Sequence, residues 1–214
     1  MLITIIAITV LSAAITFLLT PLAILLAKKY GLIDDPIKRP HPAHTHTGII
    51  PRAGGLTILL GIFLPLFFIA AVNQQIIGIL FGAVILTVVG LWDDIKDRSP
   101  YIRFLTNCLA ALVVIAAGVG VPYITNPLGG VINLDSFQLK INFFGPHSII
   151  VLADLLAFFW IVWTTNIIGW SGGVDGQLPG FVAISAMVIG LLSLRYTSTD
   201  PNYFYVTVLS FLTA

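Results

Sequence analysis

The chain has 214 residues, of which 58% are hydrophobic and only 9% are charged, and its mean hydropathy is +1.04. Soluble domains carry about 25% charged residues, so this composition excludes a soluble globular domain and a disordered chain. The net charge of +1 leaves no basic surface of the kind that binds nucleic acid. One cysteine, Cys108, excludes a disulfide framework and a cysteine-type zinc site. The sequence therefore predicts an all-α, polytopic integral membrane helical bundle.

Long apolar runs predict the transmembrane helices, because a bilayer requires about 20 predominantly apolar residues per span. A seventh run begins near Tyr203 and reaches Ala214, which is too short to cross a bilayer. We therefore expect about six complete spans plus a truncated seventh. They form a single transmembrane domain over residues 1–214, incomplete at its C-terminus. The six expected helices cover Leu2–Ala27, Leu56–Val72, Ile76–Trp92, Tyr101–Val119, Ile149–Ile168 and Leu178–Leu194.

The distribution of Lys and Arg predicts the orientation in the membrane. With the N-terminus outside, the loops 28–52, 93–100 and 169–177 lie on the cytoplasmic side. Two of the ten basic residues, Lys140 and Arg195, then lie outside. The cytoplasmic loops and the adjoining helix end hold the rest: Lys28, Lys29, Lys38, Arg39, Arg52, Lys96, Arg98 and Arg103.

The expected outer face carries one long polar segment, Gly120–His147. Its stretch Val131–Phe143 alternates loosely between polar and apolar residues, which predicts a short hairpin or cap.

Three carboxylates, Asp93, Asp94 and Asp97, sit where an expected helix meets the cytoplasm. If the helix continues by one turn, Asp93 and Asp97 share a face. Close carboxylates at the membrane edge repel one another, and a hard divalent cation relieves that repulsion. Mg²⁺ commonly binds through one or two carboxylates plus substrate phosphates. The alternative is a solvated loop in which Lys96 and Arg98 pair with the acidic residues.

The loop 28–52 contains His46 and Arg52 before the pair Gly54-Gly55. Arginine grips phosphate oxygens bidentately, and a helix that begins at two glycines offers exposed N–H groups to an anion. A phosphate-contacting or positioning histidine is favoured over structural zinc here, because no Cys or Glu completes a ligand set. Simple loop solvation stays an alternative.

The third loop is rich in glycine, with five glycines between residues 169 and 180. Such a backbone is able to wrap a ligand, although a flexible turn is the simpler interpretation. Asn166 lies at the cytoplasmic end of an apolar helix, where its amide needs a partner. Asp175 is the loop's only charge.

Together these three loops resemble the polyprenyl-phosphate N-acetylhexosamine-1-phosphate transferases, and the resemblance runs from the first helix to the last residue. The acidic motif of that family is matched by Asp93-Asp94-x-x-Asp97 followed by Ser99-Pro100. The other two are matched by His46 with Pro51-Arg52-Ala53-Gly54-Gly55, and by Asn166 through Gly176, of which Asn166, Gly173, Asp175 and Gly176 are kept.

The resemblance implies an enzyme in a bacterial-type plasma membrane, with a catalytic domain whose active site is on the cytoplasmic face. A membrane polyprenyl phosphate attacks a UDP-N-acetylamino sugar, and UMP leaves. The implied cofactor is Mg²⁺, or Mn²⁺, held by Asp93 and Asp94. Either Asp removes or positions a proton, or an Asp attacks covalently. The implied substrate-binding residues are His46, Arg52, Asp97, Asn166, Gly173 and Asp175.

The chain also departs from the family pattern. Gly169 replaces the second Asn of the third loop, Gly172 replaces its first Asp, and His44 stands where a Lys is common. These departures indicate a divergent subfamily rather than the peptidoglycan enzyme itself. A later Gly-Asp-x-Gly-Ser loop and a His-rich loop do not occur before Ala214, so we expect this chain to be the larger, N-terminal part of a complete member.

Three rival interpretations remain. An ion-coupled transporter would need ionisable residues at mid-membrane, of which the expected spans offer few. A prenyl synthase would carry two Asp-Asp-x-x-Asp motifs on a largely soluble fold. An inactive relative that serves as a scaffold or binding subunit is compatible with the substitutions at Gly169 and Gly172.

Overall fold

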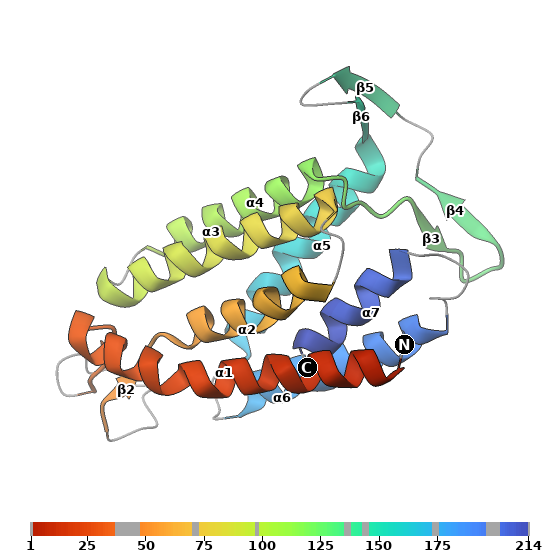
Figure 1. The fold of residues 1–214 in the computed structure, drawn as a ribbon. Helices are drawn as coiled ribbons and strands as arrows, with labels where there is room; N and C mark the ends of the chain where they lie inside the picture. Colours follow the sequence, from red (N-terminus) through yellow and green to blue (C-terminus); the bar gives the residue numbers. More distant parts are fainter. Residues whose placement is uncertain are drawn as a thin grey trace. The chain divides into compact units, whose positions relative to one another are not determined.

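The computed structural model describes residues 2–36, 48–69, 73–96, 99–134, 138–142, 146–172, 176–195 and 202–213 (Figure 1). These residues are mostly helical. The helices are α1 (Leu2–Tyr30), α2 (Gly54–Ile69), α3 (Gln74–Lys96), α4 (Pro100–Ala116), α5 (Val151–Trp170), α6 (Gln177–Leu194) and α7 (Asn202–Thr213). The strands are β1 (Ile33–Asp34), β2 (Ile50–Pro51), β3 (Tyr123–Thr125), β4 (Val131–Asn133), β5 (Gln138–Asn142) and β6 (Pro146–Ile150).

Four helices are long and apolar enough to cross a membrane: Ile5–Tyr30 within α1, and all of α3, α5 and α6. Two shorter apolar helices, Gly54–Phe67 and Pro100–Ala116, correspond to the second and fourth expected spans. The apolar residues of these helices are largely exposed on the protein surface, as expected for contact with lipid. The prediction of an all-α, polytopic membrane protein is confirmed.

Helix α1 and the acidic helix α3 both run further than the apolar pattern predicts. Helix α1 continues to Tyr30 and ends at Gly31, whose φ of 74° is the left-handed conformation that glycine adopts at helix ends. The Leu32 N–H then donates to the Ala27 carbonyl at 2.9 Å. Helix α3 continues past the apolar run to Lys96, so its last turn carries Asp93 and Asp94.

The expected hairpin within Val131–Phe143 is wrong in its pairing. Strand β4 pairs with the earlier strand β3, and strand β5 pairs with the later strand β6, each in an antiparallel two-stranded sheet. Two glycines in the β3–β4 turn explain the first pairing, since Gly129 and Gly130 both have positive φ (109° and 83°). A turn that needs positive φ favours glycine, so Gly129-Gly130 sends the chain back onto β3.

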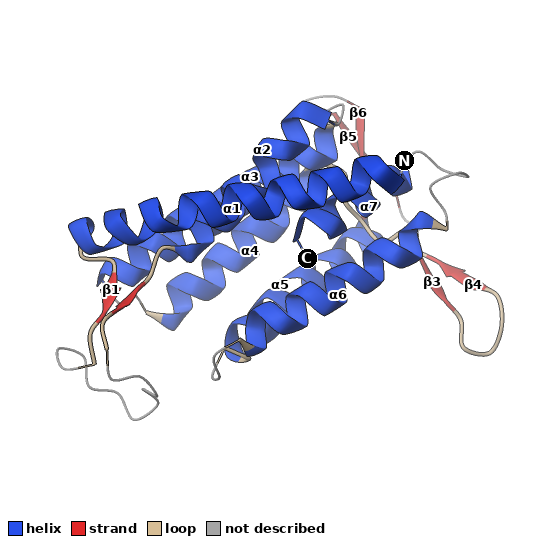
Figure 2. Ribbon diagram, turned by 60° about the horizontal axis from the view of Figure 1, so that its bottom comes forward, coloured by secondary structure: helices blue, strands red, loops and turns tan. Residues whose placement is uncertain are grey.

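The chain divides into two compact units, and the prediction of a single transmembrane catalytic domain stays a prediction. The first unit comprises Met1–Ala71, Gly90–Asp97 and Trp170–Ala214. In it, α7 lies against α6, α1 and α2, and α1 also packs on α2 (Figure 2). The unit therefore holds the loop between α1 and α2 together with the acidic end of α3.

Small and hydroxylated residues let the helices of the first unit approach closely. The Ser12 hydroxyl on α1 donates to the Gly61 carbonyl on α2 at 2.7 Å and lies 3.2 Å from the Leu212 carbonyl on α7. On α6 and α7, the buried hydroxyls of Ser193 and Thr207 are 2.7 Å apart. Small residues and interhelical hydrogen bonds of this kind are typical of helix packing in membranes.

The second unit comprises Val72–Val89 and Arg98–Gly169, and so holds the larger part of α3 with α4, α5 and the hairpins β3–β4 and β5–β6. Helix α4 begins at Pro100 behind the N-cap Ser99. Two glycines of α3 face α4, because a Cβ built on Gly78 would lie 2.1 Å from the Ala117 Cβ, and one on Gly82 would lie 3.0 Å from Val114. Glycine is therefore required for this helix contact.

Candidate active site

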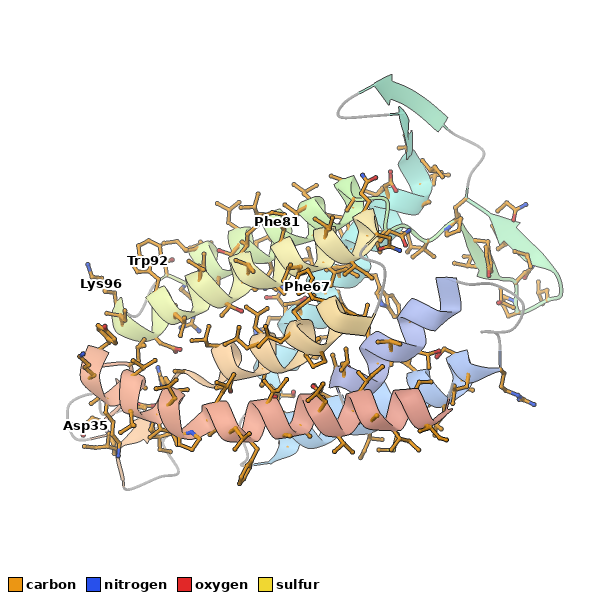
Figure 3. The ribbon with its side chains drawn as sticks, in the orientation of Figure 1. Asp35, Phe67, Phe81, Trp92 and Lys96 are labelled. Atoms are coloured by element: carbon orange, nitrogen blue, oxygen red, sulfur yellow. The ribbon has the colours of Figure 1, made fainter. Side chains whose placement is uncertain are left out.

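The acidic motif lies in the last turn of helix α3. The helix continues through Asp93 and Asp94 to Lys96, beyond its expected end at Trp92, while Asp97 lies outside the described residues. Figure 3 labels Trp92 and Lys96 on this turn. Asp93 is buried and Asp94 is half-buried. Because successive helical residues point about 100° apart, the two neighbouring carboxylates leave the helix in different directions.

The loop between α1 and α2 begins and ends in a small antiparallel sheet, which we call the clasp (residues 32–34 and 50–52). Ile33 is paired with Pro51 and Asp34 with Ile50. The Arg52 N–H extends the ladder by donating to the Leu32 carbonyl at 2.8 Å. The clasp therefore holds together the two ends of a loop whose middle, residues 37–47 with the predicted ligand His46, lies outside the described residues.

Arg52 connects the clasp to the acidic end of α3. Its Nη2 donates a hydrogen bond to Oδ2 of Asp34, and its Nη1 lies 3.8 Å from Oδ1 of Asp94. The predicted residues Arg52 and Asp94 are thus brought together. A guanidinium beside two carboxylates at the end of a membrane helix is an arrangement suited to binding phosphate oxygens and divalent cations.

A small apolar cluster fixes the clasp against the helices. Ala23 and Ala27 of α1, Leu32 and Ala53 are buried together, and Leu91 of α3 packs against them. Alanine at three of these positions lets the backbones come close. This apolar packing holds the backbone of the clasp next to α3, and so it keeps Arg52 close to Asp94.

Sequence reasoning did not assign a role to Asp34, which the structure places in contact with Arg52. Asp34 is buried, with 7% of its surface exposed. The sequence does show opposite charges, Asp34 and Arg52, in the segments at the two ends of the loop between α1 and α2. Only the register of the clasp shows that these two side chains are neighbours.

The third predicted loop is described in part. Asn166 lies inside α5, which continues to Trp170, and its Nδ2 donates to the Val162 carbonyl at 2.7 Å. This bond is the partner that a membrane-embedded amide requires. Asn166 belongs to the second unit, whereas Arg52 and Asp94 belong to the first. Gly173 and Asp175 lie outside the described residues.

Among the residues that the structure describes, no group of three or more His, Cys, Asp or Glu side chains forms a metal-binding cluster. The carboxylates at the end of α3 still fit a hard cation chemically, since Mg²⁺ often takes only one or two protein carboxylates and completes its shell with water and phosphate. Oxygen ligands on Asp93 and Asp94 suit this cation better than a soft metal.

Comparison with known proteins places the chain in a family. Residues 76–214, more than half of the chain, match Glycosyl transferase family 4. The chain belongs to this family. The Glycosyl transferase family 4 match includes Asp93 and Asp94 at the end of α3 and the segment from Asn166 to Gly176. The resemblance inferred from the three loop motifs is therefore confirmed at the level of the family.

Curated bacterial relatives extend the likeness to the N-terminal helix and the clasp. A probable undecaprenyl-phosphate N-acetylglucosaminyl 1-phosphate transferase of Bacillus subtilis is 26% identical over 186 residues, which cover 86% of this chain and 47% of the relative. A phospho-N-acetylmuramoyl-pentapeptide-transferase of Limosilactobacillus reuteri is 28% identical, over 91% of this chain and 59% of the relative. A decaprenyl-phosphate N-acetylglucosaminephosphotransferase of Mycobacterium leprae is 27% identical, over 95% of this chain and 50% of the relative. The chain spans about half the length of these relatives.

Proposed function

We propose that this chain belongs to a membrane transferase that moves an N-acetylamino-sugar 1-phosphate from a UDP-sugar to a polyprenyl phosphate and releases UMP. The observation that carries the proposal is the placement of Arg52 beside Asp94, at the end of α3, in a member of Glycosyl transferase family 4. The three relatives support it by their names, which are undecaprenyl-phosphate N-acetylglucosaminyl 1-phosphate transferase, phospho-N-acetylmuramoyl-pentapeptide-transferase and decaprenyl-phosphate N-acetylglucosaminephosphotransferase.

The charges of the site suit this reaction. Both reactants carry phosphate, so the attacking lipid phosphate and the sugar diphosphate repel each other until cations screen them. Arg52 supplies a guanidinium that binds phosphate oxygens. This interaction becomes stronger as negative charge develops on the leaving UMP. The loop residue His46 is proposed as a second phosphate contact, and Asn166, Gly173 and Asp175 as parts of the nucleotide-sugar pocket.

Mg²⁺ is the proposed cofactor, with Asp93 and Asp94 as its protein ligands and Asp97 as a further substrate-side carboxylate. When bound, the ion neutralises charge on the diphosphate. Two roles remain for the aspartates of this chain. In the first, one of them removes or positions a proton on the lipid phosphate. In the second, one attacks the sugar-side phosphate and expels UMP, and the lipid phosphate then displaces the aspartate from the covalent intermediate.

The proposed site of action is the cytoplasmic face of a bacterial plasma membrane. The multi-pass helical fold and the membrane-enzyme relatives support a membrane location. The positive-inside bias puts the clasp and the end of α3 on the cytoplasmic side, where UDP-sugars are found. The product would enter cell-envelope glycan synthesis, such as that of peptidoglycan or lipopolysaccharide.

The test is a reconstitution of the full-length protein in lipid nanodiscs. We expect UMP release from UDP-N-acetylglucosamine that requires both polyprenyl phosphate and Mg²⁺, and that stops on chelation with EDTA. A reaction without added polyprenyl phosphate is the control for simple hydrolysis. Binding of both substrates without UMP release would instead identify an inactive relative, and substrate-driven ion flux would identify a transporter.

A further inference from the structure

The clasp puts a second acidic side chain next to Arg52. In its register Arg52 stands opposite Leu32, and Asp34 stands two residues further along the same strand, opposite Ile50. Opposite residues share a face of a sheet, and so do residues two apart, so Asp34 and Arg52 are diagonal neighbours on one face. Their ion pair therefore follows from the backbone pairing and not from a chance meeting of long side chains.

The two ion pairs of Arg52 are unequal. The contact with Asp34 is a hydrogen bond, whereas the 3.8 Å between Nη1 and Asp94 Oδ1 exceeds the usual length of an N–H···O hydrogen bond. The Asp34 side chain is 9% exposed, but those of Arg52 and Asp94 are 33% and 31% exposed. The guanidinium is thus anchored at a buried end and faces Asp94 at a more open end.

We propose that Asp34 is a positioning residue, which anchors the Arg52 guanidinium through Nη2 so that Nη1 stays beside Asp94 for a diphosphate ligand. The inference rests on the proposed function and deepens it, because it explains how the positively charged guanidinium of Arg52 is oriented. Because a buried carboxylate holds Nη2, the Arg52 side chain has fewer accessible rotamers in the free protein. Less conformational entropy is therefore lost when a phosphate binds. When Nη1 turns from Asp94 to a phosphate, the bond to Asp34 keeps the arginine in place.

The competing explanation is that Asp34 only closes the loop. In that case its loss lowers the stability of the clasp but leaves the binding of a diphosphate unaffected once the protein is folded. The two roles are separated by a measurement of ligand affinity in the presence and absence of Arg52.

The experiment is a double-mutant cycle on the full-length protein, with the dissociation constant of radiolabelled UDP as the readout. We expect Asp34→Asn to raise the Kd for UDP about tenfold, the loss that follows when one hydrogen bond to a charged group is removed. In the Arg52→Ala background, Asp34→Asn should have little further effect, because there is no guanidinium left to position. Asp34→Glu keeps the carboxylate, and should recover part of the affinity.

Asp35 gives a matched control, since it is the next residue, is also buried, and carries the same charge (Figure 3). Among the described residues, the ion pairs of Arg52 are those with Asp34 and Asp94. The effects of Asp35→Asn and Arg52→Ala on the Kd for UDP should therefore be additive. If Asp34→Asn does not accumulate as folded protein, the cycle is run with Asp34→Glu, which should weaken UDP binding less and again only when Arg52 is present.

Three results would overturn the inference: additive effects of Asp34→Asn and Arg52→Ala, a lower melting temperature of Asp34→Asn with an unchanged Kd for UDP, or no binding of UDP to the wild-type protein. Failure of the proposed function looks different. A wild-type protein that binds UDP but releases no UMP contradicts the transferase reaction, while the cycle still reports whether Asp34 positions Arg52.

Discussion

Asp93 and Asp94 occupy the point at which helix α3 leaves the apolar part of the chain, and they differ in environment. Asp93 is buried, and Asp94 is half-buried beside Arg52. Many neutral residues would stabilise the helix better at this position, because Asp is a weak helix former. Since Asp94 also lies beside a guanidinium from another element, we expect the two aspartates to serve the chemistry of the site rather than the stability of the helix.

The first prediction concerns these two carboxylates. In the full-length protein, Asp93→Asn and Asp94→Asn should each lower the rate of UMP release by roughly 10²-fold, because each removes a charge that holds the cation or moves a proton. Asparagine keeps nearly the same volume, so the melting temperature should change little. The measurement is kcat from UMP release with saturating substrates and Mg²⁺.

The conservative change Ile95→Val on the same turn is the control for mere disturbance of the helix end. Ile95 is 42% exposed, so the loss of one methyl group should leave kcat unchanged. Wild-type activity in both Asp93→Asn and Asp94→Asn would show that the acidic motif is not catalytic.

At the scale of helices, close packing of α1 and α2 depends on Gly61. A Cβ added there would lie 1.9 Å from Oγ1 and 3.2 Å from Cβ of Thr16, and 3.3 Å from the Ser12 carbonyl oxygen. Another rotamer of Thr16 would relieve the contact with its hydroxyl, but its Cβ and the Ser12 carbonyl oxygen cannot move without the helix. The helices themselves must therefore move apart. The same movement would stretch the hydrogen bond from Ser12 to the Gly61 carbonyl.

We therefore predict that Gly61→Ala destabilises the protein by about 1–3 kcal/mol, the usual cost of overpacking. The matched control is Gly90→Ala in α3, where an added Cβ meets nothing within 4 Å. Alanine is a better helix former than glycine by up to about 1 kcal/mol, so this change should be neutral or stabilising. Thermal unfolding in detergent measures both, and equal melting temperatures for the two variants would contradict the packing.

The hydroxyl pair between α6 and α7 gives a second test of the same kind. Thr207→Val keeps the shape of the side chain but removes its bond to Ser193, and should cost about 1 kcal/mol, the scale of a hydrogen bond between membrane helices. Ser210→Ala on α7 is the control, because Ser210 bonds to the Val206 carbonyl of its own helix. A Thr207→Val variant as stable as the wild type would show that the pair contributes nothing to docking.

For the whole molecule, the positive-inside bias makes a prediction that neither unit tests by itself. The turn of the β3–β4 hairpin should lie outside and the end of α1 inside. In a Cys108→Ala background, Leu128→Cys should react with an impermeant maleimide in right-side-out vesicles, since Leu128 is 95% exposed. Lys29→Cys should react only after the vesicles are opened.

The cysteine-free background gives the blank for this labelling. The reverse pattern, with Lys29→Cys labelled in sealed vesicles and Leu128→Cys protected, would contradict the predicted orientation. It would show that the clasp lies on the outer side of the membrane. Labelling of both in sealed vesicles would show that the vesicles leak, and the experiment would be repeated with the internal thiol blocked.

The sequence by itself determined the class of the fold and the family. Apolar runs long enough for a bilayer form helices in any arrangement, because their backbone groups are satisfied within each helix. The start of α2 at the pair Gly54-Gly55 was likewise predictable, since it depends on neighbouring residues. The apolar pattern ended α3 at Trp92, and it left the continuation through Asp93 and Asp94 as a condition rather than a prediction. The three loop motifs were sufficient for the family because they are local patterns.

Only the tertiary structure decided which distant residues meet. The partnership of Asp34 with Arg52 depends on the register of the clasp, and the pairing of β4 with β3 depends on positive φ at Gly129 and Gly130. The fit of Gly61 against Thr16 depends on how α1 and α2 pack. In each case the deciding energy comes from contacts between segments far apart in the chain, which local pattern and composition do not contain.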